Sequence, residues 1–136
     1  MPDRPDVIFV CVHNAGRSRI AEAFFNDLAR GRFHAASAGT VPADHPHPEV
    51  VAAMAEVGID VPDVPGRLLT EELAETAGTI VTMGCNVEDA CPALTVETED
   101  WGLDDPAGKS VEEVAEIRDD IERRVRNLIG RLDRER

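Results

Sequence analysis

Cys11 and Arg17 enclose a short segment whose residue types suit the binding of a tetrahedral oxyanion. The apolar run 7–10 before it predicts a buried strand, and the apolar spacing in 18–30 after it predicts a helix. A strand, a tight loop and a helix N-terminus gather main-chain N–H groups around one point, where the helix dipole adds positive potential. A cysteine at the strand end would lie on the floor of this cradle, where its thiolate is stabilised.

The other residues of the segment complete this predicted chemistry. Arg17 offers a planar fork that matches two oxygens of an oxyanion, and Ser18 can donate a hydrogen bond to the sulfur. Asn14 and Gly16 tolerate the left-handed backbone that such a loop demands. We therefore predict that Cys11 is a nucleophile. The predicted substrate-binding residues are Val12, His13, Asn14, Ala15, Gly16, Arg17 and Ser18.

A plainer interpretation of Cys11 is a small buried hydrophobic residue, which is the usual role of a cysteine at a strand end. Spacing of the C-x5-R type is also a weak signal when it stands alone. Here a strand precedes it, Asn14 and Gly16 lie within it, and Ser18 and a helix follow. This combination favours the functional interpretation.

The elements that position this segment follow from the alternation of apolar runs and helical patterns, which is typical of βαβ units and a parallel sheet. Strands are predicted at 6–11, 33–38, 78–83 and 94–97, and helices at 18–30, 46–57, 70–74 and from Ser110 onward. Ser110 and Glu113 form a capping box. The apolar face of the last helix comprises Val111, Val114, Ile117, Ile121, Val125, Leu128 and Leu132.

Composition limits the classes of function. The 136 residues predict one domain over 1–136, and no apolar run approaches the ~18 residues of a membrane helix. The charged N-terminus is unlike a signal peptide, so we expect a cytoplasmic protein with no membrane contact. A net charge of −13 without a basic stripe argues against nucleic acid. An anionic substrate must therefore be bound by the local field of the loop.

Three cysteines do not make a disulfide framework, and they point instead to redox chemistry. Zinc is the competing explanation. The spacing of Cys85 and Cys91 matches no common pair of zinc ligands, and His45 and His47 lie in a proline-rich loop that we expect to be solvated. We expect no metal and no bound cofactor.

The motifs together resemble the low-molecular-weight protein tyrosine phosphatase fold and, within it, the arsenate reductases. The segments that carry the resemblance are C-x5-R-S at 11–18, S-A-G-T at 37–40, 47–60, T-M-G-C at 82–85 with Cys91-Pro92, and 100–108. It implies an α/β, single-domain three-layer sandwich, with a four-stranded parallel sheet and helices on both faces. In such sheets ligands bind at the carboxyl ends of the strands, so 11–18, 85–91 and 104–106 should converge there.

This resemblance implies reduction of arsenate to arsenite by the Cys11 thiolate, with phosphate and sulfate as substrate analogues. Asp105, in the Asp-Pro position, would be the general acid, and a second thiol would release arsenite. Cys85 and Cys91 would form a relay that thioredoxin reduces. Gly84 stands where the thioredoxin-coupled branch has its first relay cysteine, and the mycothiol-coupled branch also carries T-M-G-C. Either external thiol is therefore open, and we favour thioredoxin.

Two other functions compete with reduction. Phosphomonoester hydrolysis would use the same loop and acid, but phosphatases of this fold carry aromatic residues after the Asp-Pro, where this chain has Ala107-Gly108, and it contains no tyrosine. A non-enzymatic oxyanion or redox sensor would need a partner-binding extension, and nothing in the sequence resembles one. Retention of both Arg17 and Asp105 favours the enzyme.

Overall fold

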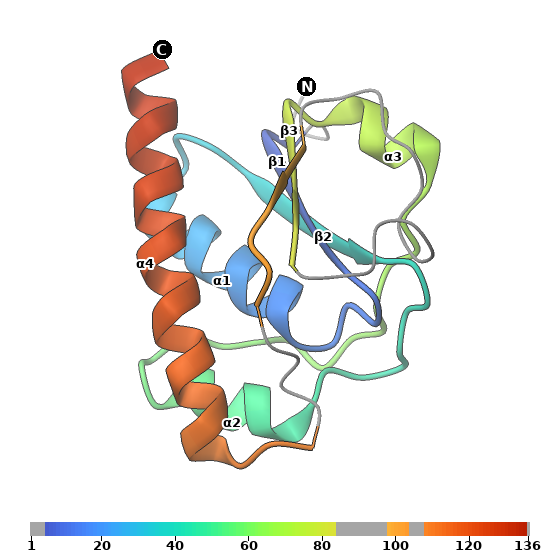
Figure 1. Ribbon diagram of the computed structural model, residues 1–136, viewed down its shortest axis with the longest axis vertical. Helices are drawn as coiled ribbons and strands as arrows, with labels where there is room; N and C mark the ends of the chain where they lie inside the picture. The colour runs from blue at the N-terminus through green and yellow to red at the C-terminus, as the bar shows by residue number, and fades with distance from the viewer. Residues whose placement is uncertain (1–4, 84–97, 104–107, 136) are drawn as a thin grey trace.

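The computed structural model describes residues 5–83, 98–103 and 108–135 of the chain (Figure 1). Its elements are β1 (Val7–Cys11), α1 (Arg17–Ala29), β2 (Ala35–Gly39), α2 (Pro48–Ala55), α3 (Glu71–Thr76), β3 (Thr79–Thr82), β4 (Thr98–Asp100) and α4 (Val111–Glu135). Within the described ranges, no helix combines the length and the apolar character needed to cross a membrane.

The sheet has the strand order β2-β1-β3-β4, and every neighbouring pair is parallel. All five residues of β1 are buried, as expected for a central strand covered on both faces. Side chains alternate along a strand, so Val7, Phe9 and Cys11 pack into one apolar cluster while Ile8 and Val10 pack into another. This arrangement confirms the predicted four-stranded parallel sheet.

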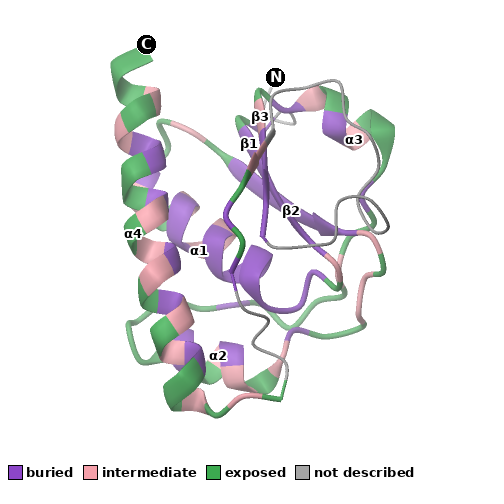
Figure 2. Cartoon of the chain, viewed as in Figure 1, coloured by how far each residue is buried: buried purple, intermediate pink, exposed green. Residues whose placement is uncertain are grey.

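Helices cover both faces of the sheet, which confirms the predicted sandwich (Figures 1 and 2). The larger cluster joins the Phe9 face to buried residues of α1, α2 and α4, and the smaller one joins the other face to α3. Aromatic rings fill the larger cluster: Phe9 lies 6.0 Å from Phe25 and 5.6 Å from Trp101, centroid to centroid. The end of β1 is thereby held rigidly between two packed layers.

Several predicted bounds differ from the structure. The helix predicted at 46–57 spans Pro48–Ala55, because Pro48 is preorganised for the first helical turn and Gly58 (φ 78°) takes a left-handed conformation after its end. The fourth strand lies at Thr98–Asp100, beyond the predicted 94–97, which falls outside the described residues. Hydrophobic patterning missed β4 because an edge strand of polar residues carries little apolar signal.

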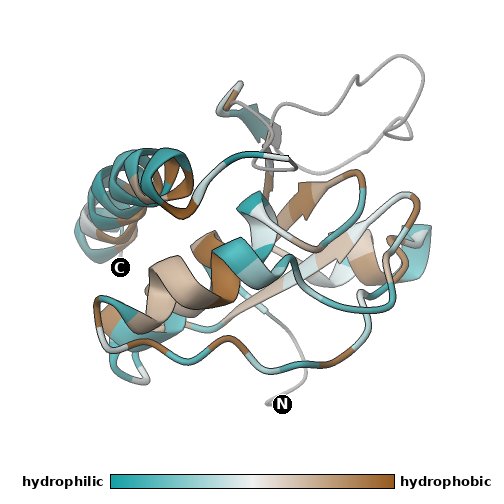
Figure 3. Ribbon diagram, turned by 90° about the horizontal axis from the view of Figure 1, so that it is seen from below, coloured by the Kyte–Doolittle hydropathy of each residue, from teal (hydrophilic) through white to brown (hydrophobic). Residues whose placement is uncertain are grey.

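The long helix α4 packs along α1 and α2 through one apolar side (Figure 3). Of the predicted face, Val114, Ile121, Val125 and Leu128 are buried, and Val111, Ile117 and Leu132 are partly buried against the same cluster. Arg118 is also buried, a position that the apolar pattern did not predict. Its Nη1 donates to the carbonyl oxygen of Ala53 at 2.7 Å and to Glu56 at 3.0 Å, which ties α4 to α2.

The capping box at the start of α4 is confirmed. The N–H of Glu113 donates to the Ser110 hydroxyl at 3.2 Å, and the N–H of Ser110 donates to the Glu113 carboxylate at 3.0 Å. Two hydrogen bonds to its carboxylate, the one from the Ser110 N–H first and the one from the Ser110 hydroxyl at 3.2 Å second, lower the pKa of Glu113 below its ordinary value of 4.5. A carboxyl group whose pKa is lowered by folding stabilises the protein above its unfolded pKa, and this contribution is lost as the pH falls through the folded pKa.

We expect Ser110→Ala to lower the melting temperature at pH 7 by roughly 2–6 °C, because an exposed helix N-terminus loses its cap. The difference in melting temperature between the variant and the wild type should become smaller between about pH 5 and about pH 3, as Glu113 becomes protonated. Thermal melts over that range measure it, with Ser110→Thr as the control that keeps a hydroxyl. A difference that widens in acid would contradict the assignment.

Candidate active site

The Cys11 segment lies at the carboxyl edge of the sheet. Cys11 is the last residue of β1, the loop 12–16 turns back, and α1 begins at Arg17. Because β1 is central, this loop is flanked by the ends of β2 and β3 (Figure 1). The helix N-terminus points its free N–H groups and the positive end of its dipole into the loop.

The loop turns its carbonyl oxygens outward. The carbonyls of residues 12–15 all accept hydrogen bonds from groups outside the loop. In order, the donors are the N–H of Val41 (2.8 Å), the N–H of Ala43 (2.9 Å), Nε of Arg19 (2.7 Å) and the N–H of His47 (2.9 Å). In a trans peptide the N–H points opposite to the C=O. The N–H groups of residues 13–16 therefore point inward, and they form a candidate anion-binding surface.

Cys11 is 3% exposed, and its sulfur lies beside the loop N–H groups. Its Sγ accepts from the N–H of Asn14 at 3.2 Å and lies 2.9 Å from the Ser18 hydroxyl oxygen. When Cys11 is a thiolate, Ser18 is the only one of this pair with a proton to donate. In that form the Asn14 N–H and the Ser18 hydroxyl can both donate to the sulfur.

Asn14 organises these contacts and is itself buried. The main-chain N–H of Arg67 donates to its Oδ1 at 2.9 Å, which fixes the amide so that Nδ2 donates to the Ser18 hydroxyl at 2.7 Å. Asn14 takes the left-handed conformation that the sequence predicts (φ 49°). Gly16 is not left-handed: with φ −137° and ψ −96° it lies in neither the helical nor the extended region. One left-handed residue suffices to turn this loop.

Arg17 connects the loop to the two strands beyond β1. Its side chain is 6% exposed, and its Nη1 donates to the carbonyl oxygens of Met83 at 2.6 Å and Leu103 at 2.9 Å. Met83 follows β3, and Leu103 follows β4. These bonds hold the guanidinium across the carboxyl ends of the strands. That Arg17 also binds the substrate stays a prediction.

Gly39 supports the loop from behind, a role that the sequence analysis did not predict. A Cβ at this position would lie 2.6 Å from the Val12 carbonyl oxygen and 2.9 Å from the Asn14 nitrogen. Both distances are shorter than van der Waals contact, so β2 can approach the loop only with glycine here. The signal was a glycine at the end of a predicted strand, which often marks a close backbone approach.

Other residues predicted for the site lie outside the described part of the chain. They are Cys85, Cys91 and Asp105. In the proline-rich loop, His45 is exposed and pairs with Asp63 at 2.9 Å, as expected for a solvated side chain. His47 is half-buried and supports the loop through its main chain. Among the described residues, no cluster of histidine, cysteine and acidic side chains could hold a metal ion.

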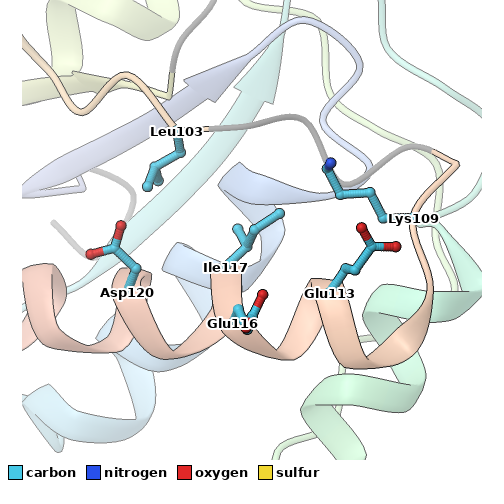
Figure 4. Close-up of a pocket in the computed structure, with 6 residues that line it drawn as sticks. All are labelled: Leu103, Lys109, Glu113, Glu116, Ile117 and Asp120. Carbon is cyan, nitrogen blue, oxygen red and sulfur yellow. The ribbon is translucent and has the colours of Figure 1, made fainter.

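A separate hollow of about 340 Å³ lies between α4 and the residues before it (Figure 4). Its lining residues are Leu103, Lys109, Glu113, Glu116, Ile117 and Asp120. With three carboxylates and one ammonium group, this hollow repels an oxyanion. The main-chain N–H groups of the Cys11 loop are therefore the better candidate for an anion site.

Comparisons with known proteins identify the family of this chain and its relatives. The family model for low molecular weight phosphotyrosine protein phosphatases matches residues 6–136. A Halobacterium salinarum protein provisionally named an arsenate reductase is 45% identical over 131 residues, which are 92% of this chain and 91% of that protein.

Solved structures of related proteins have the same fold as this chain. The Corynebacterium glutamicum thioredoxin-dependent arsenate reductase Cg_ArsC1' superposes with a TM-score of 0.81 at 33% identity, over 97% of this chain and 63% of that longer chain. This chain thus spans less than two thirds of that neighbour. The YwlE arginine phosphatase, in a mutant form with a phosphorylated active-site serine, superposes with a TM-score of 0.78 at 26% identity, over 96% and 97% of the two chains.

We expect Gly39→Ala to weaken phosphate binding by about tenfold or more and to lower stability, because the new methyl group must displace the loop backbone. Phosphate titration calorimetry and thermal melts measure the two effects. Gly130→Ala is the matched control: a methyl group there meets nothing closer than an Arg134 nitrogen at 3.7 Å, so it should stabilise α4 and leave binding unchanged. Wild-type phosphate affinity in Gly39→Ala would show that the loop does not depend on this contact.

Proposed function

Because this chain belongs to the low molecular weight phosphotyrosine protein phosphatase family, we propose that it reduces arsenate to arsenite with Cys11 as the nucleophile. One observation carries the proposal: the Cys11 sulfur is buried beneath inward-pointing N–H groups and accepts from Asn14, with Ser18 at 2.9 Å. A related protein and a structural neighbour that bear the name arsenate reductase support the choice of substrate. We also propose that residues 1–136 form one domain.

The first step is attack of the Cys11 thiolate on arsenate. The N–H groups of residues 13–16 and the Arg17 guanidinium bind the oxygens and stabilise the charge that grows on them. An S–As bond forms as one As–O bond breaks, and the departing oxygen leaves as water after taking a proton from Asp105. Arsenic is still As(V) in the product, a Cys11 thioarsenate.

The second step transfers the electrons. The Cys85 thiolate attacks the Cys11 sulfur, a disulfide forms, and the S–As electron pair passes to arsenic, which leaves as arsenite, As(III). Cys91 then attacks Cys85, which restores the Cys11 thiolate and leaves a Cys85–Cys91 disulfide. Thioredoxin reduces that disulfide with two electrons and two protons, so the cycle balances.

Support for this relay is indirect. Arg17 donates to the carbonyl oxygens of Met83 and Leu103, and in the sequence each of these lies two residues before a proposed group, Cys85 or Asp105. The name of the Corynebacterium glutamicum neighbour supports thioredoxin as the reductant. A mycothiol-type thiol, which would attack the Cys11 adduct itself, is the alternative.

Phosphomonoester hydrolysis is the second candidate function. The family and the similarity to an arginine phosphatase support phosphoryl transfer to Cys11, since phosphate and arsenate have nearly the same shape and charge. A phosphocysteine at Cys11 would then be hydrolysed by water, and no second thiol would be consumed. The two functions therefore differ in whether turnover oxidises thiols.

The relay predicts a distinct response to each external thiol. Cys85→Ser and Cys91→Ser should each lose at least about 90% of arsenate-dependent NADPH oxidation with thioredoxin and its reductase, because the disulfide that thioredoxin reduces cannot form. Cys11→Ser should abolish turnover with any reductant, since a hydroxyl is a far weaker nucleophile. Normal turnover of both relay variants with a mycothiol-type system alone would replace the relay with the direct route.

Asp105→Asn separates the reductase from the phosphatase. Arsenate turnover should fall by roughly 10²–10⁴, because the departing oxygen loses its proton donor. Sulfate affinity should stay equal or improve, because a nearby negative charge is gone. Hydrolysis of p-nitrophenyl phosphate should fall less, because its leaving group needs little protonation.

The outcome that would reject the reductase is equally specific. It is efficient hydrolysis of phosphoarginine or phosphotyrosine peptides by the wild type, with no loss of free thiols when arsenate is added. Arsenate turnover that is the same in Asp105→Asn and wild type would instead remove only Asp105 from the mechanism.

A further inference from the structure

Arg19 is a buried arginine that the proposed mechanism does not use. It lies in the first turn of α1, two residues after Arg17, and it is 6% exposed. Arginine is seldom buried to this degree unless its charge and its donors are satisfied by specific partners. The partners of Arg19 therefore indicate what it does.

All three guanidinium nitrogens of Arg19 donate to main-chain carbonyl oxygens. Nε donates to Asn14 at 2.7 Å, Nη2 to Val64 at 2.6 Å and Nη1 to Pro62 at 3.4 Å. Within the described part of the chain, Arg19 forms no hydrogen bond to a carboxylate. Arg19 thus connects the loop to the segment 62–64, and its charge is not neutralised there by a direct ion pair.

The hydrogen bond from Arg19 to Asn14 acts on the Asn14–Ala15 peptide, which follows the left-handed residue of the loop. Asn14 is the non-glycine residue that adopts a left-handed conformation within it (φ 49°). Holding its carbonyl outward keeps the N–H of Ala15 pointing inward. Main-chain N–H groups of the segment 41–47 donate to the other three outward carbonyl oxygens. Arg19 is therefore the one side chain among these four donors.

The charge of Arg19 is also directed at the site. Burial lowers its pKa, while attraction by Glu22, by Cys11 and by Asp63 opposes that effect. A guanidinium keeps its proton at neutral pH even when its pKa is lowered. Arg19 therefore places a permanent positive charge on the side of the loop toward which the Asn14 carbonyl points.

We propose that Arg19 is a positioning residue for this site: its fork fixes the Asn14–Ala15 peptide for oxyanion binding, and its charge favours the Cys11 thiolate. The proposal rests on Cys11 being the nucleophile of the proposed function. The proposal gives Arg19 two separable roles. Holding the peptide requires the guanidinium fork of an arginine, whereas favouring the thiolate requires only a positive charge.

Two variants distinguish these contributions. Arg19→Gln removes both the charge and the fork, whereas Arg19→Lys keeps a charge but cannot bond three carbonyl oxygens in one plane. Arg118→Gln is the matched control, because Arg118 is equally buried and bonds a main-chain carbonyl, that of Ala53, on a helix face away from the loop. It should lose stability without changing the site.

The readouts are phosphate affinity by calorimetry and the rate of Cys11 alkylation by iodoacetamide at pH 7, followed on the Cys11 peptide by mass spectrometry. In Arg19→Gln we expect affinity to fall about tenfold and alkylation to slow about tenfold, because charged hydrogen bonds and a nearby cation are lost. In Arg19→Lys alkylation should stay within about twofold of wild type, while affinity falls about as far as in Arg19→Gln. Arg118→Gln should match the wild type in both.

Wild-type phosphate affinity in Arg19→Lys would overturn the role of the fork, and wild-type alkylation in a folded Arg19→Gln would overturn the role of the charge. If Arg19→Gln does not fold, Arg19→Lys still decides, because affinity equal to wild type refutes the proposal. Neither readout needs arsenate turnover. A wild-type protein that fails to reduce arsenate but shows these variant effects would therefore reject the proposed function and leave the role of Arg19 intact.

Discussion

A protein with a net charge of −13 can bind an oxyanion only where local groups outweigh the field of the whole molecule. In this chain those groups are main-chain N–H groups, and the constraint on them is the planar trans peptide. Each N–H can face the anion only if the carbonyl of the same peptide unit is satisfied on the other side. The loop meets that condition at four successive peptides, and much of the surrounding structure serves to provide the donors.

This requirement explains features of the fold that otherwise look incidental. The irregular segment 41–47 donates three of the four bonds, so it acts as a support for the loop. Gly39 lets β2 approach the loop, since a Cβ there would overlap the Val12 carbonyl oxygen. Burial of β1 on both faces fixes the position of the Cys11 sulfur relative to all of them. We propose that main-chain geometry, more than side-chain charge, builds the anion site.

Sequence reasoning found the elements whose signals are local. The apolar run of β1, the periodicity of α4 and the Ser110–Glu113 capping box each lie within one continuous stretch, and each is confirmed. The residues it missed act across the fold. Arg19 reads as an ordinary polar residue of an amphipathic helix, and only the placement of segment 62–64 against α1 buries it. The polar edge strand β4 was not predicted for a related reason, since its pairing with β3 and not its own pattern makes it a strand.

The central claim is that the N–H groups of residues 13–16 form the anion-binding surface, and an NMR titration tests it most directly. Phosphate added to uniformly ¹⁵N-labelled protein should shift the amide resonances of His13, Asn14, Ala15 and Gly16 together, with one dissociation constant, while those of α4 beside the hollow at Glu113 and Glu116 stay in place. Shifts concentrated on α4, with the four loop amides unchanged at saturating phosphate, would contradict the account.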